Sequence, residues 1–268
     1  MVKLHFRREG EGEPLVILHG LYGSSDNWLG VSRKLSSKYT VWAVDLRNHG
    51  RSPHHPEHTY KAMRDDLAAF FETHRLEPAV LLGHSMGGKV AMYFAADYPQ
   101  MVKKLIVADI APRDYLELEE ESQYFLHRNI LLALQEIDLS QYTERARVEE
   151  RLAEKIGDPR IIGFLMKNTA RDLHTHRLKW RLNAPALYDH LEEIVAGVNP
   201  RWLDDRIPIT SYPVVFIRGL NSPYITDHDI PVIRTIYPEA RIVDIPDAGH
   251  WLHAEQPELF LQAVAECC

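Results

Sequence analysis

The sequence predicts an α/β protein with a mostly parallel central sheet, helices on both faces of the sheet and an inserted helical cap. Short apolar runs alternate with segments of helical periodicity, which is typical of parallel strands joined by helices. A serine between two glycines stands after one of these runs, at the start of the helical segment that follows. The alternation stops over residues 111–207, where the chain is charged and helical, and it resumes afterwards.

Six short runs are expected to be strands, and all but the last are continuously apolar, as strands covered on both faces are. They are Leu15–Leu18, Val41–Val44, Ala79–Leu82, Leu105–Ala108, Val214–Ile217 and Arg241–Ile245. Apolar residues at helical spacing follow Thr59, which suits the N-cap of a helix. Pro257 is expected in the first turn of the last helix, where proline is tolerated.

The stretch between the fourth and fifth runs interrupts this pattern. Four helices are expected in it, over Leu116–Leu134, Thr143–Ile156, Pro159–Thr169 and Tyr188–Ala196. We therefore expect residues 1–110 and 208–268 to form the core and residues 111–207 to form a helical cap over the mouth of the sheet. The alternative is that these helices continue the α/β layering, but doubly wound folds place a strand between successive helices.

The composition indicates which kinds of partner the protein binds and in which compartment it occurs. The formal net charge of −7 argues against a general nucleic-acid binder. The two cysteines, Cys267 and Cys268, are adjacent at the end of the chain, where a structural disulfide has little use, so we expect a reducing compartment. No secretory signal is apparent, and no apolar run approaches the roughly 20 residues that span a bilayer. These features predict a cytoplasmic protein without a membrane span, and they leave the oligomeric state open.

The segment Gly83-His84-Ser85-Met86-Gly87 matches the pattern G-x-S-x-G between a strand and a helix. Its glycines permit a sharp turn that lifts the serine hydroxyl clear of the sheet. The positive end of the following helix dipole points at the same place. Ser85 is therefore the predicted nucleophile of a serine hydrolase.

An oxyanion hole is expected beside this turn. The loop His19-Gly20-Leu21-Tyr22-Gly23 follows the first strong strand and can bring a backbone N–H next to Ser85. The predicted donors are the backbone N–H groups of Leu21 and Met86, placed where negative charge develops on the substrate oxygen.

His250 is the predicted general base among the 15 histidines of the chain. It lies just after the last expected strand and before the last helix, which is where this chemistry places the imidazole. His253 is close in sequence, but it falls a turn further along and is expected to pack behind the site.

The acid is harder to place from the sequence. In many proteins with this pattern it stands three residues after the glycine that ends the penultimate strand, and here that position holds Ser222. Asp109, at the end of the strand that follows the serine helix, also has access to the back of the histidine. We favour Asp109, with Asp227 as the alternative, and we expect Ser222 to support the Asp109–His250 pair.

At these residues the sequence resembles the α/β-hydrolase superfamily over its whole length, and most of all the bacterial YbfF-type acyl esterases. The resemblance is carried by Gly83–Lys89, Asp45–Pro53, Asp109–Pro112, Asn221–Tyr224 and Gly249–Glu255. It implies the α/β-hydrolase fold, the acid at Asp109 and a supporting serine at Ser222. It also implies activity on short- to medium-chain acyl esters and acyl-CoA thioesters. The cap resembles the family only around Trp180–Asn183, so it says little about the substrate.

Four further residues are candidates for contact with the substrate: Tyr22, Trp28, Arg181 and Trp251. Arg181 belongs to a basic cluster with Arg171, His174, His176, Arg177 and Lys179, which suits either an anionic substrate or a solvated helical face. No pattern of metal ligands and no nucleotide-binding glycine motif is present, so neither a metal nor a cofactor is expected.

The expected reaction is acyl transfer through an acyl-serine intermediate, with a small acyl ester or thioester as the partner. Two other functions stay open. One is a carbon–carbon lyase of the menaquinone pathway type, whose acid follows the penultimate strand, where this chain has Ser222. The other is a non-catalytic receptor for small molecules on the same fold.

Overall fold

The computed structural model describes residues 1–76, 78–116, 122–203 and 205–267. Its centre is a seven-stranded sheet in the order β1-β3-β2-β4-β5-β8-β9. The strands are β1 (His5–Glu9), β2 (Glu13–Leu18), β3 (Tyr39–Asp45), β4 (Ala79–His84), β5 (Val102–Ala108), β8 (Val214–Gly219) and β9 (Arg241–Ile245). All neighbours are parallel except β1, which pairs antiparallel with β3. This confirms the predicted fold class and all six expected strands.

The strand β1 was not predicted. It has the sequence HFRRE and lies at the edge of the sheet, with four of its five residues partly exposed and one fully exposed. An edge strand needs no continuous apolar run, because one side of it faces solvent.

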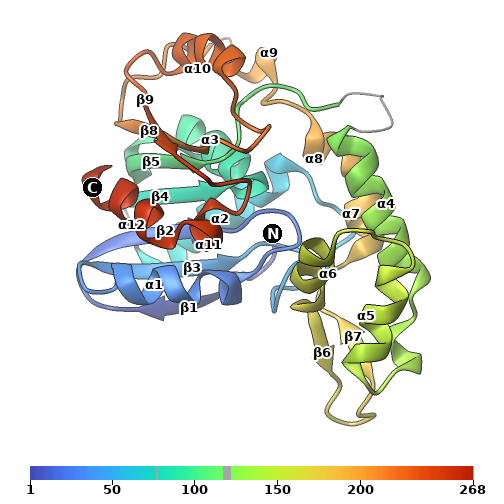
Figure 1. Cartoon of the computed structure of the whole chain (residues 1–268). Coiled ribbons are helices and arrows are strands. Elements are labelled where there is room, and N and C mark those ends of the chain that lie inside the picture. Colours follow the sequence, from blue (N-terminus) through green and yellow to red (C-terminus); the bar gives the residue numbers. More distant parts are fainter. Residues whose placement is uncertain (77, 117–121, 204, 268) are drawn as a thin grey trace.

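Helices cover both faces of the sheet (Figure 1). Helices α1 (Leu29–Leu35) and α12 (Pro257–Cys267) pack on one face, and α2 (Tyr60–His74), α3 (Met86–Asp97) and α10 (Ile230–Ile236) on the other. The alternation along β2 sends Leu15 and Ile17 to the first face and Val16 and Leu18 to the second. Both sets are fully buried, which is why the run contains no polar residue.

Short elements complete the core. They are the four-residue helix α11 (Leu252–Glu255) and the 3₁₀ turns Ser25–Trp28, Pro99–Met101 and Asp227–Asp229. The expected helix starts also form. The Thr59 hydroxyl accepts a hydrogen bond of 3.0 Å from the N–H of Ala62 at the start of α2, and Pro257 is the first residue of α12.

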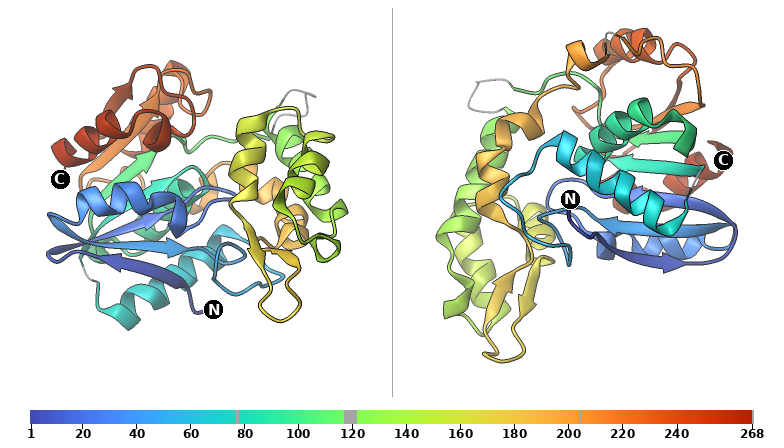
Figure 2. Two further views of the ribbon diagram at one scale, coloured as in Figure 1. Left: turned by 60° about the horizontal axis from the view of Figure 1, so that its bottom comes forward. Right: turned by 180° about the vertical axis from the view of Figure 1, so that it is seen from behind.

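Between β5 and β8 the chain leaves the sheet and forms the cap segment, residues 111–207 (Figures 1 and 2). Its helices are α4 (Gln123–Glu136), α5 (Arg145–Ala153), α6 (Pro159–Met166), α7 (Ala184–Asp189), α8 (Leu191–Val195) and α9 (Pro200–Leu203), with a 3₁₀ turn at Leu139–Gln141. The first expected helix begins later than predicted, at Gln123, after Ser122 as its N-cap. Residues 117–121 of that prediction lie outside the described part of the chain.

The cap segment is not purely helical, which corrects the prediction. Strands β6 (Thr169–Arg171) and β7 (Leu178–Trp180) pair antiparallel as a hairpin, and Thr169 belongs to it rather than to the preceding helix. Each strand has three residues, too few for the alternation of buried and exposed side chains to be recognised in the sequence.

The cap segment lies beside the carboxyl ends of the parallel strands, where Ser85 follows β4 (Figure 2). Polar contacts hold it there. The Asn183 amide donates to Asn48 Oδ1 at 2.9 Å, and the Asn168 amide donates to the carbonyl of Tyr22 at 2.8 Å. Within the described residues, no helix is both long and apolar enough to cross a lipid bilayer.

Candidate active site

Ser85 occupies a sharp turn between β4 and α3, with φ of 53° and ψ of −122°. A residue other than glycine rarely adopts a positive φ, so this backbone is strained. The turn is possible because Gly83 and Gly87 carry no side chain. A methyl group on Gly83 would overlap the carbonyl of Gly87, and one on Gly87 would overlap the carbonyls of Leu18 and His19.

The structure brings Ser85, His250 and Asp109 together in one hydrogen-bonded chain. His250 Nε2 lies 3.0 Å from Ser85 Oγ, and His250 Nδ1 lies 2.8 Å from Asp109 Oδ2. Because a carboxylate accepts hydrogen bonds, the Nδ1–H of His250 donates to Asp109, which leaves Nε2 free to accept the serine proton. The distances are those at which one side chain can deprotonate another.

Asp109 is fully buried and is held from several sides. It follows β5 with a φ of 51°, and its Oδ1 accepts a hydrogen bond of 3.1 Å from the N–H of Gly219. The hydroxyl of Ser222 donates to the same oxygen that contacts His250. Ser222 therefore contacts the Asp109–His250 pair from the position where the acid commonly stands.

The alternative acid, Asp227, lies elsewhere. Its side chain is 85% exposed and pairs with Arg218 at 2.7 Å on the surface. Among the described residues, Asp109 is the carboxylate within hydrogen-bond distance of His250.

Two further histidines lie near His250: the His84 ring packs against it, and the His253 ring packs against His84. His84 Nε2–H donates a hydrogen bond of 2.8 Å to the carbonyl of His250, and burial lowers the pKa of His84 well below its usual range. His253 stacks on Trp28, with ring centres 4.2 Å apart, and burial lowers the pKa of His253 to about 3. Both rings are therefore neutral, and they support the loop that carries His250 without adding charge to it.

The backbone N–H groups of Leu21 and Met86 donate to no other described residue. Two buried histidines hold the loop that carries Leu21. His19 Nε2 accepts from the N–H of Leu46 at 3.0 Å, and His49 Nε2 accepts from the N–H of Tyr22 at 3.2 Å. Burial lowers the pKa of both rings, so that each stays neutral and able to accept. Two unpaired donors beside Ser85 suit the binding of a developing oxyanion.

A cavity of about 520 Å³ opens above Ser85 and His250. Tyr22, Trp28 and Trp251 contribute to its wall, although Trp28 is almost wholly covered. Arg181 does not line this cavity. Its guanidinium lies 3.3 Å from a carboxylate oxygen of Asp26, in a surface ion pair.

The basic cluster predicted in the cap segment also lies away from the cavity, on and around the β6–β7 hairpin. Arg171 donates to the carbonyls of Thr143 and His176, and Lys179 pairs with Asp172 at 3.3 Å. These cations stabilise the hairpin on the protein surface, so the arrangement does not favour the prediction that they meet an anionic substrate.

Sequence reasoning missed His127 of α4, which faces the cavity from the cap segment. Its ring nitrogens lie 3.3 Å from the Tyr22 hydroxyl and 3.4 Å from the Tyr224 hydroxyl. The Tyr224 ring in turn stacks on His250, with centres 3.9 Å apart. Burial lowers the pKa of His127 to about 4. No motif surrounds His127, and its helix alone does not reveal which way the ring points.

Metal ligands are not gathered anywhere in the described residues: no three histidine, cysteine, aspartate or glutamate side chains lie together as ligands would.

Comparison with known proteins agrees with the observed fold. A family model for the α/β hydrolase fold matches residues 13–257. Esterase YbfF of Escherichia coli (strain K12) is 33% identical over 258 residues, covering 96% of this chain and 94% of that protein. The sn-1-specific diacylglycerol lipase ABHD11 of Danio rerio is 34% identical, covering 97% of this chain and 79% of that protein. A solved structure of a marine microorganism esterase is 42% identical, covers 100% of both chains and has a TM-score of 0.94.

Proposed function

The chain belongs to the α/β-hydrolase family, and we propose that it is a serine carboxylesterase that forms an acyl-serine intermediate. Its esterase/lipase-type character follows from the relatives. The proposal adds the mechanism, the catalytic residues and the substrate range. The substrates proposed are short- to medium-chain acyl esters and the corresponding acyl-CoA thioesters.

One observation carries the proposal: the chain of hydrogen bonds from Ser85 through His250 to Asp109, at 3.0 Å and 2.8 Å. An inert binding site has no need for a strained serine whose hydroxyl lies within hydrogen-bond distance of an imidazole. The same set of groups is the apparatus by which serine hydrolases activate a hydroxyl.

In the first half-reaction, Ser85 Oγ attacks the carbonyl carbon while its proton passes to His250 Nε2. The bond between the carbonyl carbon and the alcohol oxygen or thiol sulfur then breaks, and His250 returns the proton to the leaving group. In the second half-reaction, water repeats these steps on the acyl-serine. His250 takes a proton from the water, the acid leaves, and Ser85 regains its hydrogen.

Two supporting roles complete the mechanism. The N–H groups of Leu21 and Met86 donate to the oxyanion, and a donor of this kind is typically worth about 10²–10³ in rate. Asp109 holds the Nδ1–H tautomer of His250 and stabilises the imidazolium that forms. Ser222 occupies the position where lyases of the menaquinone pathway type carry their acid, and the hydrogen bond from His250 to Asp109 supports Asp109 as the acid and hydrolysis over carbon–carbon chemistry.

Labelling with a fluorophosphonate probe tests the proposal. We expect covalent labelling of the wild-type protein and hydrolysis of p-nitrophenyl acetate, and loss of both in Ser85→Ala. The matched control is Ser140→Ala, an exposed serine in the cap segment, which should behave as the wild type does. A wild-type protein that is folded but neither labelled nor active would favour the receptor function and refute the proposal.

A further inference from the structure

Two spaces of very different size meet at the hydroxyl of Ser85. The outer cavity of about 520 Å³ is lined by His250 and Trp251. An inner pocket of about 30 Å³ is lined instead by Met86 and Ile110. Residues that line both spaces place their junction at the nucleophile; they are Leu21, Ser85, Gln123, His127 and Tyr224.

The geometry of the reaction indicates which part of the substrate occupies each of the two spaces. The leaving group takes its proton from His250 Nε2, so it must lie on the side of Ser85 where His250 stands. The outer cavity is that side. The carbonyl oxygen points at the N–H groups of Leu21 and Met86, and both residues line the inner pocket. The acyl chain is attached to the carbonyl carbon on the side opposite the leaving group, so it points into the inner pocket.

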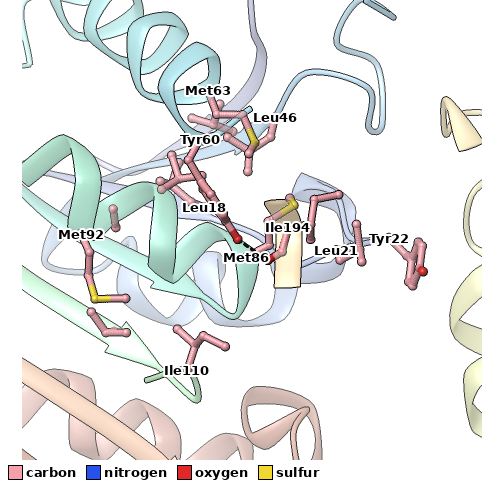
Figure 3. Packing of buried hydrophobic residues seen from close by; sticks show 14 of the residues in the cluster. Leu18, Leu21, Tyr22, Leu46, Tyr60, Met63, Met86, Met92, Ile110 and Ile194 are labelled. Atoms are coloured by element: carbon pink, nitrogen blue, oxygen red, sulfur yellow. Dashed lines mark hydrogen bonds between the residues drawn. The ribbon is translucent and has the colours of Figure 1, made fainter. Parts of the chain in front are cut away.

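We propose that the inner pocket is the acyl subsite and that it favours the shortest acyl groups of the proposed range, with the alcohol in the outer cavity. This assignment rests on the proposed function. The wall is apolar where Leu21, Met86, Ile110 and Ile194 line it, as an alkyl group requires. All four side chains are labelled in Figure 3. At about 30 Å³ the inner pocket is far smaller than the outer cavity of about 520 Å³, so a short alkyl group fits it more readily than a long one.

The cap segment forms part of the wall of the inner pocket. Ile194 of α8 lies beside Met86 and Leu21 (Figure 3). The Tyr60 hydroxyl donates to the carbonyl of Ile194 at 2.7 Å, and Lys89 Nζ donates to that of Val195 at 3.0 Å. A longer chain would have to displace a helix that these two core residues hold in place.

The far wall of the pocket also resists extension. The buried ammonium of Lys89 lies 4.8 Å from the centre of the Tyr115 ring, and both residues line the pocket. Pushing methylene groups against the buried Nζ of Lys89 would cost its hydrogen bonds. In a closed apolar pocket, one misfitting methylene typically changes kcat/KM by about 10–200-fold.

The test compares p-nitrophenyl acetate, propionate, butyrate and hexanoate as substrates of the full chain. We expect kcat/KM for the acetate to exceed that for the hexanoate by about tenfold or more. Ile194→Ala should raise the hexanoate-to-acetate ratio by about tenfold, because it opens the end of the inner pocket. Ile194→Val, which removes one methyl group and spares the packing, should raise the butyrate-to-acetate ratio in the same direction.

The matched variant is Ile161→Ala, which widens the outer cavity by the same side-chain change. It should leave the ratios of kcat/KM between acyl chain lengths unchanged. It should instead change how kcat/KM depends on the alcohol in a series of acetate esters. If Ile161→Ala rather than Ile194→Ala extends the acyl range, the two spaces are assigned the wrong way round. Equal hydrolysis of hexanoate and acetate by the wild type refutes the acyl assignment alone. Absence of hydrolysis of every ester refutes the proposed function, and the acyl assignment with it.

Discussion

The two walls of the active-site cavity are built in different ways. On the core side, Ser85, Asp109 and His250 follow the carboxyl ends of β4, β5 and β9, and hydrogen bonds within the core fix them. On the cap side, α4, α6 and α8 contribute mostly apolar side chains together with His127. The core side is therefore suited to set the chemistry, and the cap side to set which substrates reach it.

The two walls also differ in how they are held. Neighbouring strands place the core residues through continuous backbone ladders. The cap segment is joined to the core by separate side-chain contacts at Asn168, Asn183 and Lys89. Changes in the core wall should thus alter the rate of the chemical step, whereas changes at the junction should alter stability and the fit of the substrate.

The largest effect is expected from the core wall. Asp109→Asn should lower kcat on p-nitrophenyl acetate by up to about 10⁴-fold, because an amide no longer holds His250 in the tautomer that accepts the serine proton. Asp227→Asn is the matched control, since its carboxylate is exposed and pairs with Arg218 at 2.7 Å. If the control loses activity while Asp109→Asn retains it, the acid has been assigned to the wrong residue.

A smaller effect is expected where the two walls join. Lys89 is almost wholly buried, and its ammonium donates to the carbonyls of Val195 and Ala196 at the end of α8. Lys89→Met should lower the free energy of unfolding by about 2–4 kcal/mol, because each buried carbonyl left without a donor costs about 1–3 kcal/mol. Removal of a buried charge returns part of that cost.

The control for this change is Lys103→Met, an exposed lysine paired with Glu13, which should cost less than about 1 kcal/mol. Urea unfolding of the two variants measures the difference. Equal stability of Lys89→Met and Lys103→Met would show that Lys89 does not secure the cap segment.

The smallest effect concerns a single proton in the cap wall. The pKa of His127 is lowered to about 4 in the folded protein by burial, while an unfolded histidine has a pKa of about 6.5. Above pH 6.5 neither state binds this proton. Below it the unfolded state binds the proton first, so stability falls as the pH falls towards 4. Between pH 7.5 and 5.5 this one group should contribute a loss of about 1.4 kcal/mol.

Urea unfolding at these two pH values measures the loss. In His127→Gln the loss in the free energy of unfolding between these pH values should be smaller by about 1.4 kcal/mol than in the wild type. Gln135→Ala, a change on the same helix without a titratable group, should leave the loss as it is. An identical loss in His127→Gln and the wild type would mean that His127 is already protonated in the folded protein, or never buried.

Prediction from sequence was most complete where local pattern determines structure. The strands of the core appear as continuous apolar runs because both faces of a parallel sheet are covered. It was least complete at the edge strand β1, which is partly exposed, and at the hairpin β6–β7, which has three residues in each strand. Arg181 illustrates the same limit: its charge suggested a substrate contact, but the fold pairs it with Asp26 on the surface.

The sequence by itself determined the fold family and pointed to Ser85 and His250, because a glycine-flanked turn and a histidine after the last strand each carry their own local geometry. Only the tertiary structure placed Asp109 and Ser222 beside His250, since these groups come from separate strands of the sheet. It alone brought His127 to the outer cavity and Ile194 to the inner pocket. Helical periodicity shows that a residue faces a partner, but the packing of the cap segment on the core decides which partner it faces.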